Sequence, residues 1–524
     1  MKQRFPSFHK IYRNTATSML PERMFVPLML LTSLTAGLFF FTVLVLKGYF
    51  MIDGSFYIYA PWAVTHSKLL YKDFFFGQPP LFAYIYGYGQ KILHLGYGII
   101  PTRIFASLIG FITIILAFFI SCWIGQSRKA GYFTLLVLLT DVEMIRDFSC
   151  EKLYPLASFF LTLSLFFYFI PIRISRMSRY AIVLSCLALT FGTRFFAISG
   201  YIWGLFFILF VEKNLSFHKK LVAITVSLFI LMIIFVPPYF YAGKDLFHYN
   251  LWGFHSNTVG RGLFAIIKSK ISIPIQAFRH HWLLVLCSLL LIFANKSLIK
   301  EQLIKLNFGF GLLLMILLTH FISHWVTLDY QSYLIPGFCA LVIPLAYKTL
   351  SHSLKKPIKM IIGYSLIIIA PFYGLGNIQV FFSGEAPDIK IIRQAGRELK
   401  QLTNPSEKIM IFNGAVLVEA DRPTIPGAES LPFSYQHFLP DSLCLKYRLL
   451  NKRLFYHALD NKEFAALALT KGTFSLLLPV AIPAPPEVEK EIWERINRNY
   501  SIVKRIPFTK LDNEEVLIYL PKRR

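Results

Sequence analysis

The sequence predicts an all-α polytopic membrane protein of about 11 transmembrane helices, followed by a small C-terminal α/β domain outside the membrane. Of its 524 residues, 55% are hydrophobic and only 16% are charged, whereas soluble globular chains have about 25% charged residues. Apolar runs close to the ~20 residues that cross a bilayer recur along most of the chain. After about residue 383, the composition becomes that of a soluble domain.

Apolar segments and basic connectors together define the predicted topology. Lysine and arginine cluster in short connectors, for example around Arg176, Lys220 and Lys356. Because basic residues favour the cytoplasmic side, this pattern places the N-terminus in the cytoplasm and the C-terminal domain outside. The predicted spans cover residues 25–46, 102–124, 131–142, 153–171, 181–192, 196–211, 221–238, 281–294, 306–323, 331–347 and 358–375.

The remaining connectors hold most of the polar side chains, and the topology makes them outer loops at residues 47–101, 141–152 and 239–280. We divide the chain into a transmembrane domain, residues 1–380, and an extracytoplasmic domain, residues 381–524. In the second domain, helical patterns alternate with short apolar strands, as in α/β proteins. Helices are expected at 388–402 and 487–499, and strands at 408–412, 472–480 and 515–520.

Charge and cysteine usage argue against several kinds of function. The net charge of +26 comes mainly from the basic connectors, so it indicates affinity for anionic membrane lipids and no nucleic-acid partner. The six cysteines include no CxxC or Cys/His cluster, and no glycine-rich phosphate-binding motif occurs. His248 and His255 have no third ligand nearby. No cofactor is predicted, and ligand spacing does not support a divalent metal.

Asp53 is the strongest candidate for a catalytic residue. It follows the first apolar span, and Tyr57 lies one helical turn beyond it on the same face. An aspartate beside apolar and aromatic side chains loses hydration, which makes its carboxylate a stronger base than in water. The alternative is a membrane anchor, but aspartate is too short to extend far toward the head groups.

An ordered set of acidic, aromatic and proline residues fills the first outer loop. It consists of Asp53, Tyr57, Ala60, Tyr71, Asp73, Pro79 and Pro80, with Arg103 at the start of the second span. This pattern resembles the GT-C superfamily of polyprenyl-phosphate-dependent glycosyltransferases, such as protein O-mannosyltransferases, lipid A aminoarabinose transferases and rhizobial-type lipopolysaccharide core transferases. The layout of about eleven spans and an outer C-terminal domain is similar as well. The second acid of the family pattern is Gly54 here, which leaves a metal-assisted or paired-acid mechanism unsupported.

The resemblance implies a glycosyltransferase that takes a sugar from a polyprenyl-phosphate donor in the bilayer to an acceptor hydroxyl at the outer face. Asp53 is then the general base for direct displacement with inversion at the anomeric carbon. The leaving phosphate needs cationic partners, because an unpaired phosphate beside apolar surface is costly. The candidate substrate-binding residues, with Glu151 also a possible acidic partner of Asp53, are Tyr57, Asp73, Arg103, Glu151, Lys152, Arg194, Arg261, His324 and Tyr330.

Several of these residues have a second interpretation. Glu151 and Lys152 also fit a local surface ion pair, and Asp73 also fits a role in bracing its loop. His324 and Tyr330 are equally typical of an interfacial aromatic belt.

Two other functions stay open for the whole chain: a transporter of lipid-linked sugars or solutes, and a catalytically inactive scaffold. Transporters place ionisable groups near the membrane midplane. The predicted span centres are nearly devoid of such groups, which favours the enzyme. The compact loops, rich in lysine and phenylalanine, favour a bacterial inner membrane. The acceptor is a lipid, a glycan or a protein.

Overall fold

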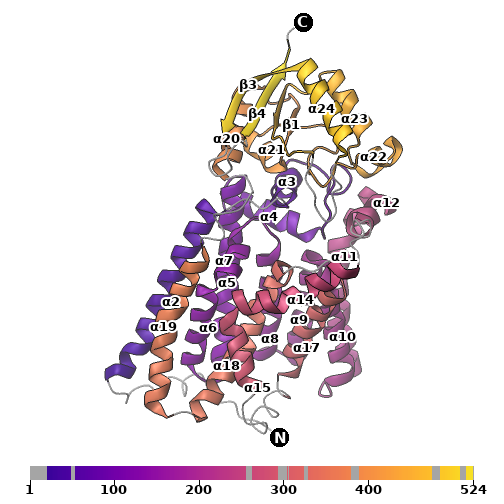
Figure 1. The fold of residues 1–524 in the computed structure, drawn as a ribbon. Coiled ribbons are helices and arrows are strands. Elements are labelled where there is room, and N and C mark those ends of the chain that lie inside the picture. Colours follow the sequence, from indigo (N-terminus) through magenta and orange to yellow (C-terminus); the bar gives the residue numbers. More distant parts are fainter. Residues whose placement is uncertain are drawn as a thin grey trace.

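A bundle of helices forms most of the molecule and carries a mixed α/β unit on its upper end (Figure 1). The computed structural model describes residues 20–48, 53–254, 263–292, 304, 306–323, 328–353, 355–378, 389–474, 484–507 and 515–522. The eleven predicted spans all fall on helices. These are α2 (Leu20–Lys47), α5 (Ile99–Gly125), α6 (Arg128–Thr140), α8 (Tyr154–Phe169), α9 (Arg176–Thr193), α10 (Ile198–Phe206) with η2 (Phe207–Val211), α11 (Phe217–Ala242), α15 (Trp282–Ile292), α17 (Asn307–Ile322), α18 (Ile335–Ser353) and α19 (Lys356–Ile378).

Helix length and composition mark this chain as an integral membrane protein. Within the described residues, five helices are long and apolar enough to cross a membrane: Met24–Lys47, Ile99–Gly125, Phe217–Ala242, Gln331–Ser351 and Pro357–Ile378. Two pairs pass the same test together but are bent, α7 (Val142–Ser149) with α8 by 110° and α14 (Leu263–His280) with α15 by 100°. The number rises to seven if each bent pair is one span.

The predicted outer loops fold largely into helices, of which α3, α4 and α12 lie at the upper end of the bundle (Figure 1). The bend between α7 and α8 has a local cause. Pro155 stands in the first turn of α8, where its missing N–H costs nothing, so a new helix begins there after the connector at residues 150–153. At the other end of α7, Asp141 Oδ1 accepts the Met144 N–H at 2.9 Å and caps the helix. The elements in these loops are α3 (Gly54–Thr65), α4 (Leu81–Ile92), α7, α12 (Lys244–His248), η3 (Tyr249–Gly253) and α14. Two further short helices, η1 (Phe195–Ala197) and η4 (Leu328–Leu334), lie in connectors between predicted spans or at a span's start.

The C-terminal unit (residues 389–522) contains a four-stranded sheet of order β1-β2-β4-β3. Strands β1 and β2 are parallel, and β4 is antiparallel to both β2 and β3. Its elements are α20 (Ile389–Leu402), β1 (Ile409–Ile411), α21 (Gly414–Ala420), α22 (Asp441–Tyr447), α23 (Lys452–Asp460), β2 (Ala466–Leu469), α24 (Pro486–Asn499), β3 (Tyr500–Pro507) and β4 (Glu515–Pro521).

Most of the predicted elements of this unit are present, with one correction. The strand predicted at 472–480 is wrong in its described part, because residues 471–474 form a turn and the strand is Ala466–Leu469 instead. Residues 475–480 lie outside the described part of the chain.

The two faces of the sheet belong to two hydrophobic cores, as the two-residue period of strands requires. Ile409 and Ile411 join the core that contains α20, α21 and the helix bundle. Met410, between them, joins a second core with α23 and α24. The unit therefore faces the bundle with α20 and α21.

Specific polar contacts fix the C-terminal unit to the bundle. The Ile99 N–H donates to Glu419 Oε1 at 2.9 Å, and Ser430 Oγ donates to the Phe75 carbonyl at 3.1 Å. At Gly414, a Cβ atom would lie 2.5 Å from the carbonyl oxygen of Glu429 and 3.1 Å from that of Ser55. Only glycine allows α21 to approach α3 this closely.

Glu429 is expected to make the stability of this arrangement depend on pH. Burial raises the pKa of this carboxyl from 4.5 to about 7, and its Oε2 accepts the Gly427 N–H at 2.7 Å. The folded protein therefore binds the proton more tightly than the unfolded chain. The resulting stabilisation is complete below about pH 4, and roughly 3 kcal/mol of it is lost as the pH rises through 7.

The measurement is the thermal midpoint of the detergent-solubilised protein between about pH 5 and pH 8. Glu429→Gln keeps a hydrogen-bond acceptor without the charge and should remove most of the fall in midpoint. Glu494→Gln, on an exposed residue, is the matched control. An identical pH slope in wild type and Glu429→Gln would contradict the assignment.

Candidate active site

Asp53 lies at the upper end of the bundle, directly before α3. Its side chain is 29% exposed and makes no side-chain capping hydrogen bond. Lys152 Nζ lies 3.8 Å from Asp53 Oδ2, and the Lys152 side chain is only 2% exposed. The ammonium group and the N-terminus of α3 both favour the ionised carboxylate, which is the form that can accept a proton.

Lys152 and Arg194 share one aromatic neighbour, Tyr154. Lys152 Nζ lies 5.0 Å and Arg194 Cζ 5.4 Å from the centroid of the Tyr154 ring. Arg194 Cζ is also 5.4 Å from the ring of Phe196. Both cations are buried, and each is attracted to the aromatic face. The structure thus brings two predicted cations, from the α7–α8 connector and the end of α9, to one aromatic ring, and Lys152 also lies beside Asp53. Two buried cations so placed suit an anionic group such as a phosphate.

The local backbone explains these positions. Lys152 stands in the sharp connector between α7 and α8, where its N–H donates to the Cys150 carbonyl at 2.9 Å. The Tyr86 hydroxyl donates to the Lys152 carbonyl at 3.3 Å. Arg194 ends α9 in an extended conformation, with φ −134° and ψ 116°, before η1 begins. Both cations therefore lie at helix breaks.

Arg103 and Glu151, predicted to contact substrate, lie buried against each other. Arg103 Nε lies 2.5 Å from Glu151 Oε2, Nη2 lies 3.2 Å from Oε1, and the two side chains are 1% and 0% exposed. Arg103 Nη1 also donates to the carbonyls of Leu44 and Gly48, both at 3.0 Å. The pair ties the end of α2 to the connector that holds Lys152. The alternative of a surface pair between Glu151 and Lys152 does not fit, since both are buried.

Tyr57 and Asp73 lie in the structured first loop. Tyr57 is buried, and its ring centroid lies 5.3 Å from that of Phe82 and 6.4 Å from that of Phe76. Asp73 Oδ2 accepts the Leu69 N–H at 2.6 Å, which agrees with the bracing interpretation. Substrate contact by these two residues stays a prediction.

For three of the predicted site residues, the structure does not describe the side chain. Arg261 and His324 lie outside the described residues. Tyr330 falls within η4, whose backbone is described, but nothing follows about its side chain.

Sequence reasoning missed an aromatic and histidine group that continues from Arg194. The ring centroids of Phe196 and His320 are 4.7 Å apart, and His320 Nε2 lies 3.0 Å from the Tyr333 hydroxyl. His320 lies in an apolar segment without a charged neighbour in sequence. Tyr154 had a signal that could have been used, because it follows Lys152 by two residues.

Within the described ranges, no group of three or more His, Cys, Asp or Glu side chains is arranged to hold a metal ion.

Comparison with known proteins identifies solved structures that share the fold of this chain. No protein-family model and no curated protein sequence matches the chain. Among solved structures, ArnT from Cupriavidus metallidurans in the apo state matches with a TM-score of 0.62 and 11% identity, over 93% of this chain and 97% of ArnT. ArnT bound to undecaprenyl phosphate matches with a TM-score of 0.60 and 11% identity, over 95% and 97%. The predicted GT-C resemblance is confirmed at the level of the fold, and this chain has the fold of ArnT.

Proposed function

We propose that this protein is a membrane glycosyltransferase that moves a sugar from a polyprenyl-phosphate donor to an acceptor hydroxyl. The observation that supports this most directly is the pairing of a half-buried carboxylate, Asp53, with the buried cation Lys152 at 3.8 Å. The shared fold adds support, because an ArnT structure holds undecaprenyl phosphate.

In the proposed reaction, Asp53 accepts the proton of the acceptor hydroxyl as the hydroxyl oxygen bonds to the anomeric carbon. The bond from that carbon to the phosphate oxygen breaks at the same time, so the configuration inverts. Polyprenyl phosphate leaves with the bonding electron pair. Lys152 and Arg194 stabilise the charge that develops on the phosphate, the role that positioned cations have in transfer reactions.

A single carboxylate serves as base in this proposal. Gly54 replaces the second acid of the family pattern, and Glu151 is held by Arg103 at 2.5 Å. Glu151 therefore acts on Asp53 indirectly, by fixing the connector that carries Lys152.

The site lies at the end of the bundle that bears the C-terminal unit, which we assign to the outer face of the membrane. The basic connectors support this orientation. The donor reaches the site from the bilayer, and the acceptor, a lipid, glycan or protein, reaches it from the side of the C-terminal unit.

The direct test is transfer of radiolabelled sugar by the purified protein in proteoliposomes. Polyprenyl-phosphate donors with different sugars are supplied with membrane extract as the source of acceptors. Labelled product that depends on the protein supports the proposal. Absence of transfer with every donor, together with protein-dependent movement of labelled donor across the bilayer, would favour the transporter.

Lys152→Gln is expected to lower kcat/KM for the donor about tenfold, because one charge-assisted contact to the phosphate is lost. Lys152→Arg retains the charge and should restore part of the affinity. The measurement is initial rate against donor concentration. An unchanged kcat/KM in Lys152→Gln would remove Lys152 from the phosphate site.

A further inference from the structure

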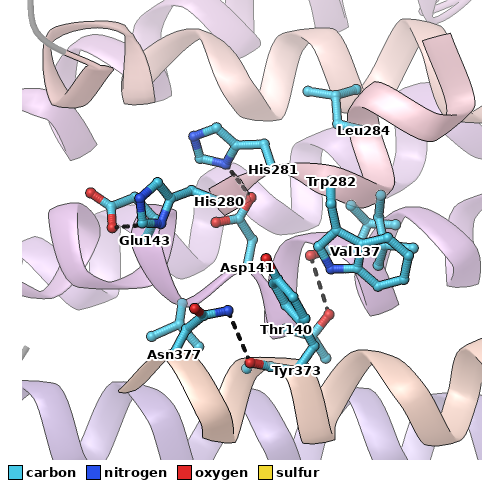
Figure 2. Close-up of a pocket in the computed structure, with 13 residues that line it drawn as sticks. Val137, Thr140, Asp141, Glu143, His280, His281, Trp282, Leu284, Tyr373 and Asn377 are labelled. Carbon is cyan, nitrogen blue, oxygen red and sulfur yellow. Dashed lines mark hydrogen bonds and ion pairs between the residues drawn. The ribbon is translucent and has the colours of Figure 1, made fainter. Parts of the chain in front are cut away.

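A small cavity lies away from the candidate active site, between α6, α7, α19 and the junction of α14 and α15 (Figure 2). Its volume of about 20 Å³ is enough for one group of the size of water. Asn377, in the last turn of α19, lies on its wall, so the cavity is at the upper end of the bundle, near the level of lipid head groups. Its polar and aromatic lining consists of Thr140, Asp141, Glu143, His280, His281, Trp282, Tyr373 and Asn377.

Two carboxylates and two histidines form pairs in the cavity wall. His281 Nδ1 lies 2.6 Å from Asp141 Oδ2, and both side chains are at most 4% exposed. His280 Nδ1 lies 3.5 Å from Glu143 Oε2. Figure 2 shows the two pairs on adjacent sides of the cavity. Buried His281 Nε2 has no hydrogen-bond partner among the described residues.

The charge of the wider cluster favours a cation. Arg146 Nη2 lies 2.5 Å from Glu143 Oε1 and 2.7 Å from Asp147 Oδ1, so one guanidinium forms ion pairs with two carboxylates. With Asp141, the cluster contains three carboxylates and one guanidinium. The cluster carries a net negative charge when its carboxylates are ionised and its two histidines are neutral. An added cation lowers the cost of burying this charge.

Exposed apolar side chains lie next to the lining residues on α19. The ring centroids of Trp282 and Tyr373 lie 5.3 Å apart, and both residues are half-buried lining residues. On α19, Phe372 and Leu375 alternate with the lining residues and are 69% and 40% exposed. Tryptophan and tyrosine beside exposed apolar side chains are typical of the head-group level of a bilayer.

We propose that this cavity binds the primary ammonium group of a phospholipid head group. An ammonium group is close to water in size, and its three N–H donors match Asp141, Glu143 and the Asn377 side-chain oxygen. A trimethylammonium group is larger and has no N–H donor for these acceptors. The site therefore selects amino lipids over choline lipids. This inference is independent of the proposed transferase activity.

The test measures retention of lipids by the full-length protein, using native mass spectrometry after release from mixed nanodiscs. The probes are phosphatidylethanolamine, its N-monomethyl form, phosphatidylcholine and phosphatidylglycerol, all with the same acyl chains. We expect phosphatidylethanolamine to be retained about tenfold more than phosphatidylcholine, with the monomethyl form between them. Equal retention of all four shows a cavity that holds only water and overturns the proposal, as does a preference for phosphatidylglycerol.

Two variants test whether the lipid preference arises from binding in this cavity. Asp141 and Glu143 are ion-paired, so loss of either risks unfolding, whereas half-buried Asn377 is a safer position. Asn377→Leu should abolish the preference for phosphatidylethanolamine. Asn307→Leu makes the same change at an exposed position at the start of α17 and should leave the preference intact. A full preference in Asn377→Leu overturns the assignment to this cavity.

Discussion

Replacing Asp53 by asparagine is expected to lower kcat for sugar transfer by about 10²–10⁴-fold, the range that a positioned general base contributes. The asparagine side chain has nearly the same shape, but its amide does not take up the proton of the acceptor hydroxyl at neutral pH. The asparagine side chain keeps an oxygen facing the buried Lys152, and the thermal midpoint of the variant is measured alongside its activity to exclude unfolding. The measurement is the initial rate in proteoliposomes at saturating donor.

A matched control separates loss of the base from loss of negative charge at this end of the molecule. Asp245, 61% exposed, is ion-paired with Lys446 in the C-terminal unit, and Asp245→Asn makes the same chemical change there. We expect its kcat to stay within about twofold of wild type. Wild-type activity in Asp53→Asn would remove Asp53 as the base but would leave a transferase with another base possible.

The second large effect concerns stability. Arg103→Met leaves the Glu151 carboxylate buried without its guanidinium partner, and removal of one member of a buried pair costs about 3–5 kcal/mol. The variant also removes the donor to the last carbonyls of α2. We expect a marked fall in the thermal midpoint in detergent, with transfer activity lost in step, because the connector that carries Lys152 loses its anchor.

The double variant Arg103→Met with Glu151→Leu distinguishes the two contributions. It removes the buried unpaired charge, so much of the stability should return. The carbonyls of Leu44 and Gly48 stay without their donor, so recovery should be incomplete. A double variant as unstable as Arg103→Met would show that the contact with α2, and not the ion pair, dominates.

The eleven predicted spans fall on helices because long apolar runs are a local signal, but only five to seven of the described helices or bent pairs are long and apolar enough to cross a membrane. The strands of the C-terminal unit were harder. The run Ala466–Leu469 alternates alanine and leucine and has low strand propensity, yet it is buried on both faces and pairs with β1 and β4. Such a strand is determined by its tertiary neighbours. The sequence alone favours the more apolar run that follows it, residues 472–480.

The candidate site shows the same limit. Sequence adjacency suggested a pair between Glu151 and Lys152. The turn between α7 and α8 directs the two side chains to different partners, Arg103 for Glu151 and Asp53 for Lys152. Residue types near Asp53 could be predicted from the loop pattern, but partners far along the chain depend on how the helices pack.

Because the two faces of the sheet belong to two different cores, the C-terminal unit is not expected to fold apart from the bundle. One face of its strands completes a core that is continuous with the bundle. A fragment beginning near residue 389 would expose that face to water, so we expect it to aggregate when expressed alone. The C-terminal unit and the bundle should instead unfold together in one cooperative transition. The C-terminal unit therefore cannot act as a lid that opens by detaching from the bundle.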